Sequence, residues 1–163
     1  MKFQRGEHKI FPQPSIFSDF HGLTRTNPSG GNHPQGIDRV EGHRVAVITG
    51  GTKGIGKAIA RRLAQDGCAI VLNYSRDEEA AQSALREFDG LSEKVVALKA
   101  DVSMPHEASR LIETAVSSLG RLDILVNNVG PFLTRALCDT TDDEWRRTLD
   151  SNLSSAFYCS RAA

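Results

Sequence analysis

The stretch VITGGTKGIG at residues 47–56 decides the fold, because it joins an apolar run to the start of a helical pattern. Four glycines fall within seven residues, directly after the β-branched run 44–49. Glycine allows a sharp turn and lets a ligand approach the backbone closely. A helix N-terminus leaves backbone N–H groups unpaired and carries partial positive charge. This placement predicts a loop that holds a phosphate or diphosphate where the helix begins.

The rest of residues 44–163 alternates apolar runs with amphipathic helical patterns. Four strands are predicted, each followed by a helix: 44–49, 69–73, 94–100 and 122–127. Continuous apolar strands that alternate with helices are typical of a parallel sheet covered on both faces. Right-handed crossovers turn this order into a doubly wound α/β sheet of the Rossmann type.

Local signals set the ends and faces of the expected helices. Ile55, Ile59 and Leu63 predict the inward stripe of the first helix. Ser103 is expected to cap the third helix, and the box Thr141–Glu144 is expected to open the last one. One face of that last helix is expected to carry four large apolar residues: Trp145, Leu149, Leu153 and Phe157.

Residues 1–43 differ in composition from the rest of the chain. They hold four of the six prolines and four of the five histidines, and the histidine spacing fits no metal site. The segment is predicted to be a disordered or poorly ordered N-terminal extension. The alternatives are that the segment is a docking arm, or that the start of the protein was assigned too far upstream.

Composition limits the possible partners and compartments. Twenty basic and twenty acidic residues cancel, which argues against nucleic acid or an anionic membrane as a partner. No apolar run is long enough for a membrane span or a secretory signal. The three cysteines, Cys68, Cys138 and Cys159, form no Cys-x-x-Cys pair, so we expect reduced thiols and a cytoplasmic protein.

A nucleoside triphosphatase loop is a rival interpretation of the glycines. Gly51-x-x-x-x-Gly56-Lys57 matches the P-loop pattern up to its last position. Ala58 stands there in place of the serine or threonine that would bind magnesium, which counts against this interpretation.

Four blocks in order resemble the short-chain dehydrogenase/reductase family. The loop Thr49-Gly50-x-x-x-Gly54-Ile55-Gly56 is similar to the family's cofactor loop, and NNVG at 127–130 is similar to its Asn-Asn-Ala-Gly. ADV at 100–102 resembles the segment near the adenine, and LDSNLSSAFYCSRAA at 149–163 resembles the helix with the catalytic asparagine. The resemblance covers about 44–163 and is strongest to 3-oxoacyl-(acyl-carrier-protein) reductases.

The resemblance implies an oxidoreductase that transfers hydride between a nicotinamide coenzyme and a carbonyl or alcohol. The substrate would be a small molecule or an acyl-carrier thioester, and the complete protein would be a homo-oligomer. It implies Asn152 as a catalytic residue, although an asparagine within a helix can simply bond neighbouring backbone. The coenzyme-binding residues that it implies are Thr49, Gly50, Thr52, Lys53, Gly54, Ile55, Gly56, Tyr74, Ser75, Arg76, Asp101, Val102, Asn127 and Gly130.

Charge at the end of the second strand predicts NADP(H) rather than NAD(H). An acid there would bond the ribose 2′-OH of NAD, but the strand ends in Asn73-Tyr74-Ser75-Arg76. Lys53 and Arg76 are candidates for a 2′-phosphate, with ordinary solvated bases as the alternative.

The family's catalytic Tyr-x-x-x-Lys does not occur in this sequence, because Glu78 follows Tyr74 and Ala162 follows Tyr158 at that spacing. The chain therefore resembles the N-terminal, cofactor-binding half of a reductase and is expected to be inactive alone. A non-catalytic dinucleotide-binding or assembly module, and an inactive remnant, are the alternatives. In the usual strand order 3-2-1-4 the run 124–126 lies at an edge, so poor solubility, or a partner, is also expected.

Overall fold

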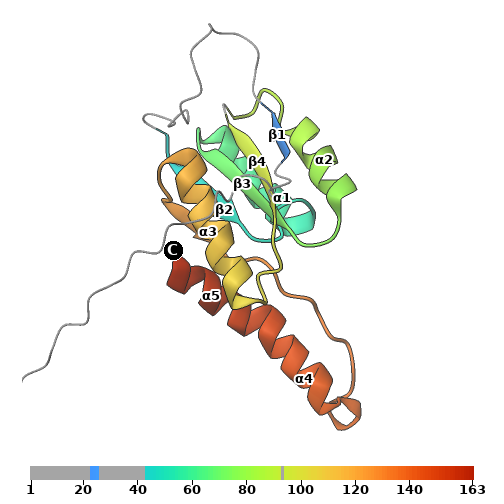
Figure 1. Ribbon diagram of the computed structural model, residues 1–163. Helices are drawn as coiled ribbons and strands as arrows, with labels where there is room; N and C mark the ends of the chain where they lie inside the picture. Colours follow the sequence, from blue (N-terminus) through green and yellow to red (C-terminus); the bar gives the residue numbers. More distant parts are fainter. Residues whose placement is uncertain (1–22, 26–42, 93) are drawn as a thin grey trace, which may run out of the picture.

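The structure is a computed structural model that describes residues 23–25, 43–92 and 94–163 (Figure 1). Strands and helices alternate along the chain from residue 45 onward, as the sequence predicts. The strands are β1 Leu23–Arg25, β2 Val45–Ile48, β3 Ala69–Tyr74, β4 Val95–Lys99 and β5 Ile124–Val126. The helices are α1 Gly54–Gln65, α2 Glu78–Glu87, α3 Pro105–Leu119, α4 Asp142–Leu149 and α5 Ser155–Ala162.

The five strands form one sheet in the order β1-β4-β3-β2-β5. β2, β3, β4 and β5 are parallel, with Val47 opposite both Val71 and Leu125. The predicted doubly wound sheet is confirmed, and β5 lies at an edge as expected. β1 is antiparallel to β4 and belongs to the N-terminal extension, the rest of which (1–22 and 26–42) lies outside the described residues.

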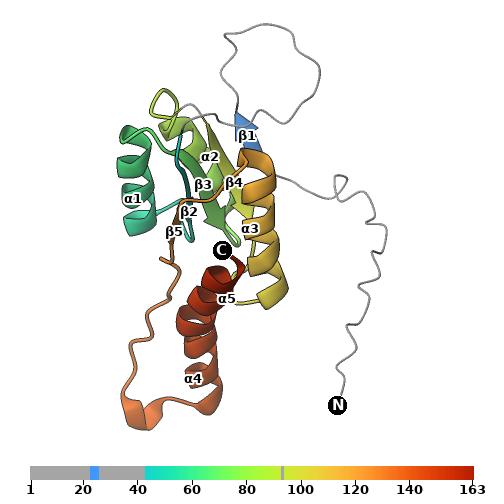
Figure 2. The ribbon, with the colours of Figure 1, turned by 90° about the vertical axis from the view of Figure 1, so that its left-hand side faces the viewer.

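Helices cover both faces of the sheet and form three layers. Figure 2 shows α1 and α3 on opposite sides of the strands. One core cluster joins α1 and α2 to Ile48, Ile70 and Leu72, and the other joins α3 and α5 to the opposite face. Alternation along each strand sends successive side chains to these two clusters.

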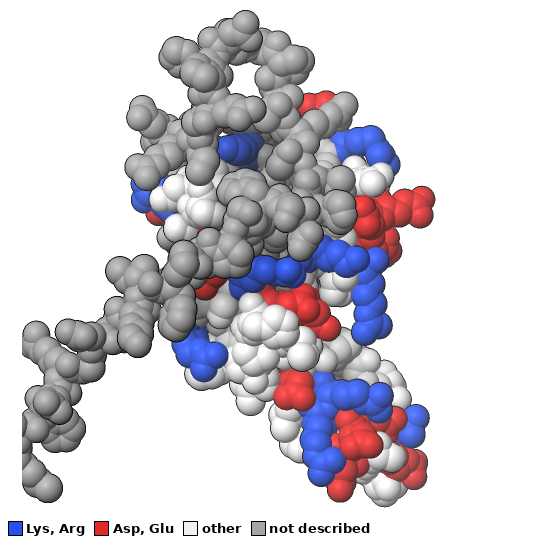
Figure 3. Space-filling model, viewed as in Figure 1, with Lys and Arg blue, Asp and Glu red and all other residues white. Residues whose placement is uncertain are grey.

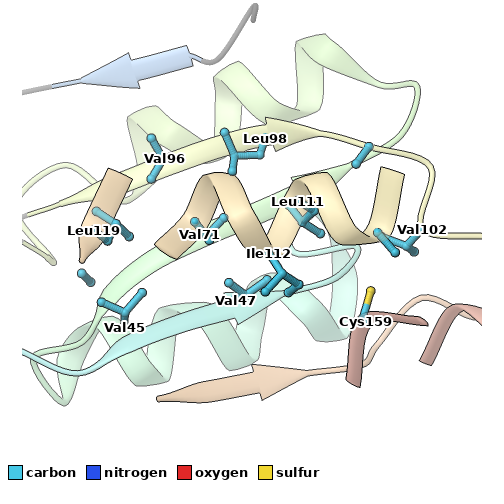
Figure 4. Packing of buried hydrophobic residues seen from close by; sticks show 14 residues of the cluster. Val45, Val47, Val71, Val96, Leu98, Val102, Leu111, Ile112, Leu119 and Cys159 are labelled. Atoms are coloured by element: carbon cyan, nitrogen blue, oxygen red, sulfur yellow. The ribbon is translucent and has the colours of Figure 1, made fainter. Parts of the chain in front are cut away.

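The cluster under α3 is built from β-branched and leucine side chains (Figure 4). Val47 and Val71 of the sheet meet Leu111 and Ile112 of α3, and each is at most 3% exposed. Burying one such side chain stabilises a fold by about 1.5–3 kcal/mol, so this apolar stripe fixes α3 on the sheet.

The fully buried residues of α1 are small, which corrects the expected stripe at Ile55, whereas Ile59 is half-buried and Leu63 packs against the core cluster as expected. Gly56, Ala60 and Ala64 are the buried residues, whereas Ile55 is 75% exposed. The helix begins at Gly54, so Ile55 stands in its first turn at the outer side of the loop. Small side chains allow the helix axis to lie close to the strands.

The cap of α3 also differs from the prediction. Met104 occupies the N-cap position and makes no side-chain cap bond. The Ser103 hydroxyl donates instead to Oδ1 of Asp101 at 2.6 Å, because the chain makes a turn between β4 and the helix. The capping box of α4 is confirmed, with Glu144 N donating to Oγ1 of Thr141 at 3.3 Å.

The expected single last helix is divided by a π-helical turn at Asp150–Ser154. A π turn adds a residue to the helical repeat, which rotates the side chains that follow it. No residue of α4 is buried, and α4 extends away from the sheet (Figure 1). Trp145, Leu153 and Phe157 are each more than half exposed and Leu149 is half-buried, so the expected apolar face is not part of the core.

The described residues contain no helix that is long and apolar enough to cross a membrane. Acidic and basic side chains are mixed on the face seen in Figure 3, with several of both signs gathered at the far end of α4. No single-sign surface stands out on that face, in agreement with the balanced composition.

Asp123, just before β5, is hydrogen-bonded to the start of β2. Its Oδ2 accepts from Val45 N at 2.8 Å and from Arg121 Nε at 2.8 Å. Asp123 N in turn donates to the Val45 carbonyl at 3.0 Å. The Arg121 guanidinium, and then the Val45 amide, lower the pKa of the Asp123 carboxyl.

We predict that Asp123→Asn lowers the free energy of unfolding more at pH 7 than at pH ~3. A lowered folded-state pKa gives stability that is present above the unfolded pKa of about 3.9 and is lost as the pH falls through the folded value. Urea unfolding of wild type and variant at pH 7 and pH ~3 measures this difference.

Glu113→Gln is the matched control, because the Glu113 side chain is exposed and no ion pair or hydrogen bond engages it within the described part of the chain. An equal loss at both pH values would contradict the assignment.

Candidate functional site

The predicted site residues all lie at one edge of the sheet, where the parallel strands end. The loop 49–56 follows β2, the turn 74–77 follows β3, and residues 100–104 follow β4. Residues 127–130 follow β5, and Asn152 lies in the π turn next to them. Ligands of doubly wound sheets bind at this carboxyl edge, so the topology brings the predicted residues together.

Two glycines of the loop have different geometric roles. A Cβ on Gly56 would stand 2.5 Å from the Gly50 carbonyl oxygen and 2.6 Å from Nδ2 of Asn128. Only glycine therefore permits this close approach of α1 to its own loop. Gly54 has a φ of +49°, and a Cβ there would have no neighbour within 4 Å among the described residues. The backbone is thus accessible on the outer side of the helix start.

The first turn of α1 keeps its N–H groups free of a side-chain cap. Lys53 occupies the N-cap position with an extended backbone and makes no side-chain cap bond. Most helices use serine, threonine, aspartate or asparagine to satisfy these donors. No side chain of the described residues caps these donors, so they and the positive end of the dipole could bind an anion.

Thr49 and Asn128 tie the end of β2 to the end of β5. The Thr49 hydroxyl oxygen accepts from Asn128 N at 2.8 Å and from Val129 N at 3.1 Å. The Asn128 side chain donates to the Thr49 carbonyl at 2.9 Å. Thr49 is 1% exposed, so it fixes the loop from within and does not offer its hydroxyl to a ligand.

Asn73 supports the loop from the other side. It is 1% exposed and lies at the end of β3. Its Nδ2 donates to the Ala100 carbonyl at 3.0 Å, and its Oδ1 accepts from Gly50 N at 3.3 Å. One buried amide therefore joins the ends of β3 and β4 to the glycine loop.

The turn after β3 divides into a buried and an exposed part. Tyr74 is 4% exposed and packs in the cluster under α1 and α2, and this burial raises the pKa of its hydroxyl. Its side chain is therefore a core group, and only its backbone borders the site. Ser75 and Arg76 are exposed, and Lys53 Nζ forms an ion pair with Oδ2 of Asp77 across the turn.

The segment after β4, residues 100–104, brings backbone groups and the Asp101 carboxylate to this edge of the sheet. Val102 is 3% exposed and belongs to the core cluster under α3. Asp101 Oδ1 accepts from the Ser103 amide at 3.1 Å, while Asp101 N donates to Oε2 of Glu107 at 2.7 Å. Glu107 thus braces the backbone at the place where the predicted adenine contact would lie.

Asn152 approaches the loop after β5. Its Nδ2 donates to the Thr148 carbonyl at 2.9 Å and to the Pro131 carbonyl at 3.3 Å. A Cβ on Gly130 would overlap Oδ1 of Asn152, so a larger residue there would have to displace the Asn152 side chain. Asn127 is further away from this contact and donates to the Ser160 hydroxyl at 3.0 Å.

The two buried cysteines, Cys68 and Cys159, add no nucleophile to the site. Cys68 and Cys159 are buried and all three are free. Burial raises the pKa of the Cys159 thiol to about 11, which keeps it protonated among core side chains. Within the described ranges no three histidine, cysteine or acidic side chains gather as metal ligands.

The arrangement fits an elongated anionic ligand with two phosphates. Small residues and free donors stand at the start of α1, basic side chains stand at the β3 turn, and a carboxylate stands after β4. Sequence reasoning missed Asn73 and Asn128 as supports of this loop. The second asparagine of NNVG was a visible signal for Asn128, whereas the role of Asn73 depends on the pairing of three strands.

Known proteins of the same kind match most of the chain. The family model described as short chain dehydrogenase matches residues 44–163. An uncharacterised oxidoreductase of Methylorubrum extorquens is 40% identical over 127 residues, which are 78% of this chain and 51% of that protein. The chain spans about half the length of the curated relatives it matches.

Solved structures agree with this assignment. A short chain dehydrogenase from Burkholderia cenocepacia in complex with NADP gives a TM-score of 0.69 at 36% identity, over 77% of this chain and 51% of that one. A blue fluorescent protein from a metagenomic library, in complex with NADPH, gives 0.67 at 36% identity, over 74% and 49%. With its glycine loop, its strand order and these matches, the chain belongs to the short-chain dehydrogenase/reductase family.

Proposed function

We propose that this chain is the coenzyme-binding part of an NADP(H)-dependent oxidoreductase that acts on a carbonyl or alcohol substrate. The observation that carries the proposal is the start of α1, which has no side-chain cap and whose residue Gly56 packs against the Gly50 carbonyl of the loop. Backbone N–H groups of residues 54–56 would bond the diphosphate, and Asp101 with the backbone of Val102 would border the adenine.

The preference for the phosphorylated coenzyme rests on charge at the β3 turn. No acid stands at Asn73, Tyr74 or Ser75, where a carboxylate would bond a ribose 2′-OH. Lys53 of the glycine loop and Arg76 of this turn are both exposed. They would bind a 2′-phosphate through charge-assisted hydrogen bonds. Both NADP and NADPH occur in structures of similar proteins, which supports the same choice here.

The chain's own residues would hold and orient the coenzyme. The nicotinamide, when bound, supplies or accepts a hydride. Asn127 and Gly130 would border its ribose after β5, and Asn152 would hold a polar group beside them. The Pro131 and Thr148 carbonyls fix the Asn152 amide, so its Oδ1 is oriented towards Gly130 and remains an acceptor.

The wider assignment follows the same resemblance. We propose a small-molecule or acyl-carrier substrate, with a 3-oxoacyl thioester as the first candidate, and a homo-oligomeric complete protein. Three free cysteines, an odd number without a Cys-x-x-Cys pair, favour the cytoplasm as the place of action.

A coenzyme-binding or assembly module without catalysis is the second candidate. It is favoured by the sequence around the two tyrosines, since neither is followed by lysine four residues later. Tyr74 is in addition a buried core residue.

We predict that the purified chain gives no carbonyl-dependent oxidation of NADPH above the rate without protein. Turnover with a 3-oxoacyl thioester would contradict this prediction.

NADPH is predicted to bind at least about tenfold more tightly than NADH, a difference of ~1.4 kcal/mol. The reason is the pairing of the 2′-phosphate with Lys53 and Arg76. Titration followed by coenzyme fluorescence and by calorimetry measures both constants. Equal binding, or tighter binding of NADH, would refute the coenzyme assignment, and binding of neither would refute the proposed function.

Gly56→Ala is predicted to weaken NADPH binding at least about tenfold, because the new Cβ would collide with the Gly50 carbonyl and displace the loop. Ala58→Gly is the matched control. It lowers helix propensity in α1 by about 1 kcal/mol at an exposed position without touching the loop. Unchanged NADPH binding by Gly56→Ala would show that the loop does not carry the diphosphate.

A further inference from the structure

An ion pair connects the two segments that border the proposed 2′-phosphate position. Lys53 belongs to the glycine loop, and Asp77 follows the turn after β3. Lys53 Nζ and Asp77 Oδ2 are in direct contact, and their side chains keep 62% and 48% of their exposure. The ammonium that would receive the phosphate is thus already paired with a carboxylate of the same chain.

Asp77 is fixed in place by a second bond. It is the N-cap residue of α2, and its Oδ1 accepts from Ala80 N at 2.9 Å. Hydrogen bonds from Lys53, and then from the Ala80 amide, lower the pKa of the Asp77 carboxyl, so it is ionised at neutral pH. The cap keeps this negative charge beside the turn whether or not Lys53 stays paired.

The ion pair contributes little to folding, since exposed pairs are screened and restrict two flexible side chains. The α2 cap does not need it, because Oδ1 makes the cap bond and Oδ2 makes the contact with Lys53. Arg76, which is also exposed, takes part in no ion pair among the residues that the structure describes. The contact therefore has its main consequence for whatever else Lys53 binds.

We infer that Asp77 is a specificity-determining residue that competes with the 2′-phosphate of NADP(H) for Lys53 and so limits the preference over NAD(H). This inference rests on the proposed function. A 2′-phosphate that reaches Lys53 must share or displace the Asp77 carboxylate, and the two anions repel each other. NAD(H) carries a neutral 2′-OH at this position, so it neither has to displace the Asp77 carboxylate from Lys53 nor is repelled by it. Asp77 thereby lowers the affinity for one coenzyme and leaves the other nearly unchanged.

Asp77→Asn tests the inference with little structural change. Asparagine is as good an N-cap as aspartate, so α2 is retained. The variant removes the competing charge and should bind NADPH about fivefold more tightly, with NADH binding changed less than about twofold. The same gain should be found with adenosine 2′,5′-bisphosphate and not with adenosine 5′-monophosphate, because only the former carries the 2′-phosphate.

Two controls separate this effect from a general change of charge. Glu78→Gln removes an exposed carboxylate one residue further on, in the first turn of α2, and should leave the NADPH to NADH ratio within about twofold of wild type. In a Lys53→Met background the gain from Asp77→Asn should be smaller than in wild type, since the competition acts through Lys53. Thermal unfolding checks that each variant is folded.

Three results would overturn the inference: no gain in NADPH binding by Asp77→Asn, an equal gain for NADH, or an equal gain by Glu78→Gln. If wild type prefers NADPH and one of these occurs, the inference fails while the proposed function stands. If wild type binds neither coenzyme, the proposed function fails and the inference fails with it.

Discussion

The close approach of α1 to the loop that leaves β2 is the constraint on which the rest of this structure depends. Gly56 lies against the Gly50 carbonyl and the Asn128 amide, so no larger residue fits between the helix and the loop. Ala60 and Ala64 continue this small-residue face down the helix. Because α1 lies so close to the strands, its positive N-terminal end stands at the carboxyl edge of the sheet.

Polar side chains hold this arrangement by joining strands; Thr49 and Asn73 are buried, and Asn128 is half-buried. Thr49 and Asn128 connect β2 with β5, and Asn73 connects β3 and β4 to Gly50. Every buried side-chain polar atom in the described part of the chain has a hydrogen-bond partner. Satisfied buried networks of this kind specify one geometry, because any shift would leave a desolvated amide unpaired. The loop is therefore preorganised by the sheet itself.

The sequence predicted the four parallel strands because apolar runs and glycine turns are local signals, whereas their order and the edge position of β5 came from the usual strand order of such sheets. It failed where the outcome depends on packing. Ile55 looks like a core residue by period, but α1 begins only one residue before it. Ser103 looks like a cap, but Asp101 takes its hydroxyl. β1 pairs with β4 through three residues that carry no strand period, so only tertiary contact identifies it.

The two ends of the candidate site differ in how the fold supports them. At the glycine loop the supporting side chains of Thr49 and Asn73 are almost fully buried, and the Asn128 side chain is half-buried. Asn152 is held by two backbone carbonyls in an exposed segment, and α4 beside it buries no residue. The inner side of α5, with Ser155 and Cys159 buried, connects this end to the core. Local opening requires little loss of burial at the Asn152 end and much at the glycine loop, so the geometry of this loop should persist through fluctuations that displace Asn152.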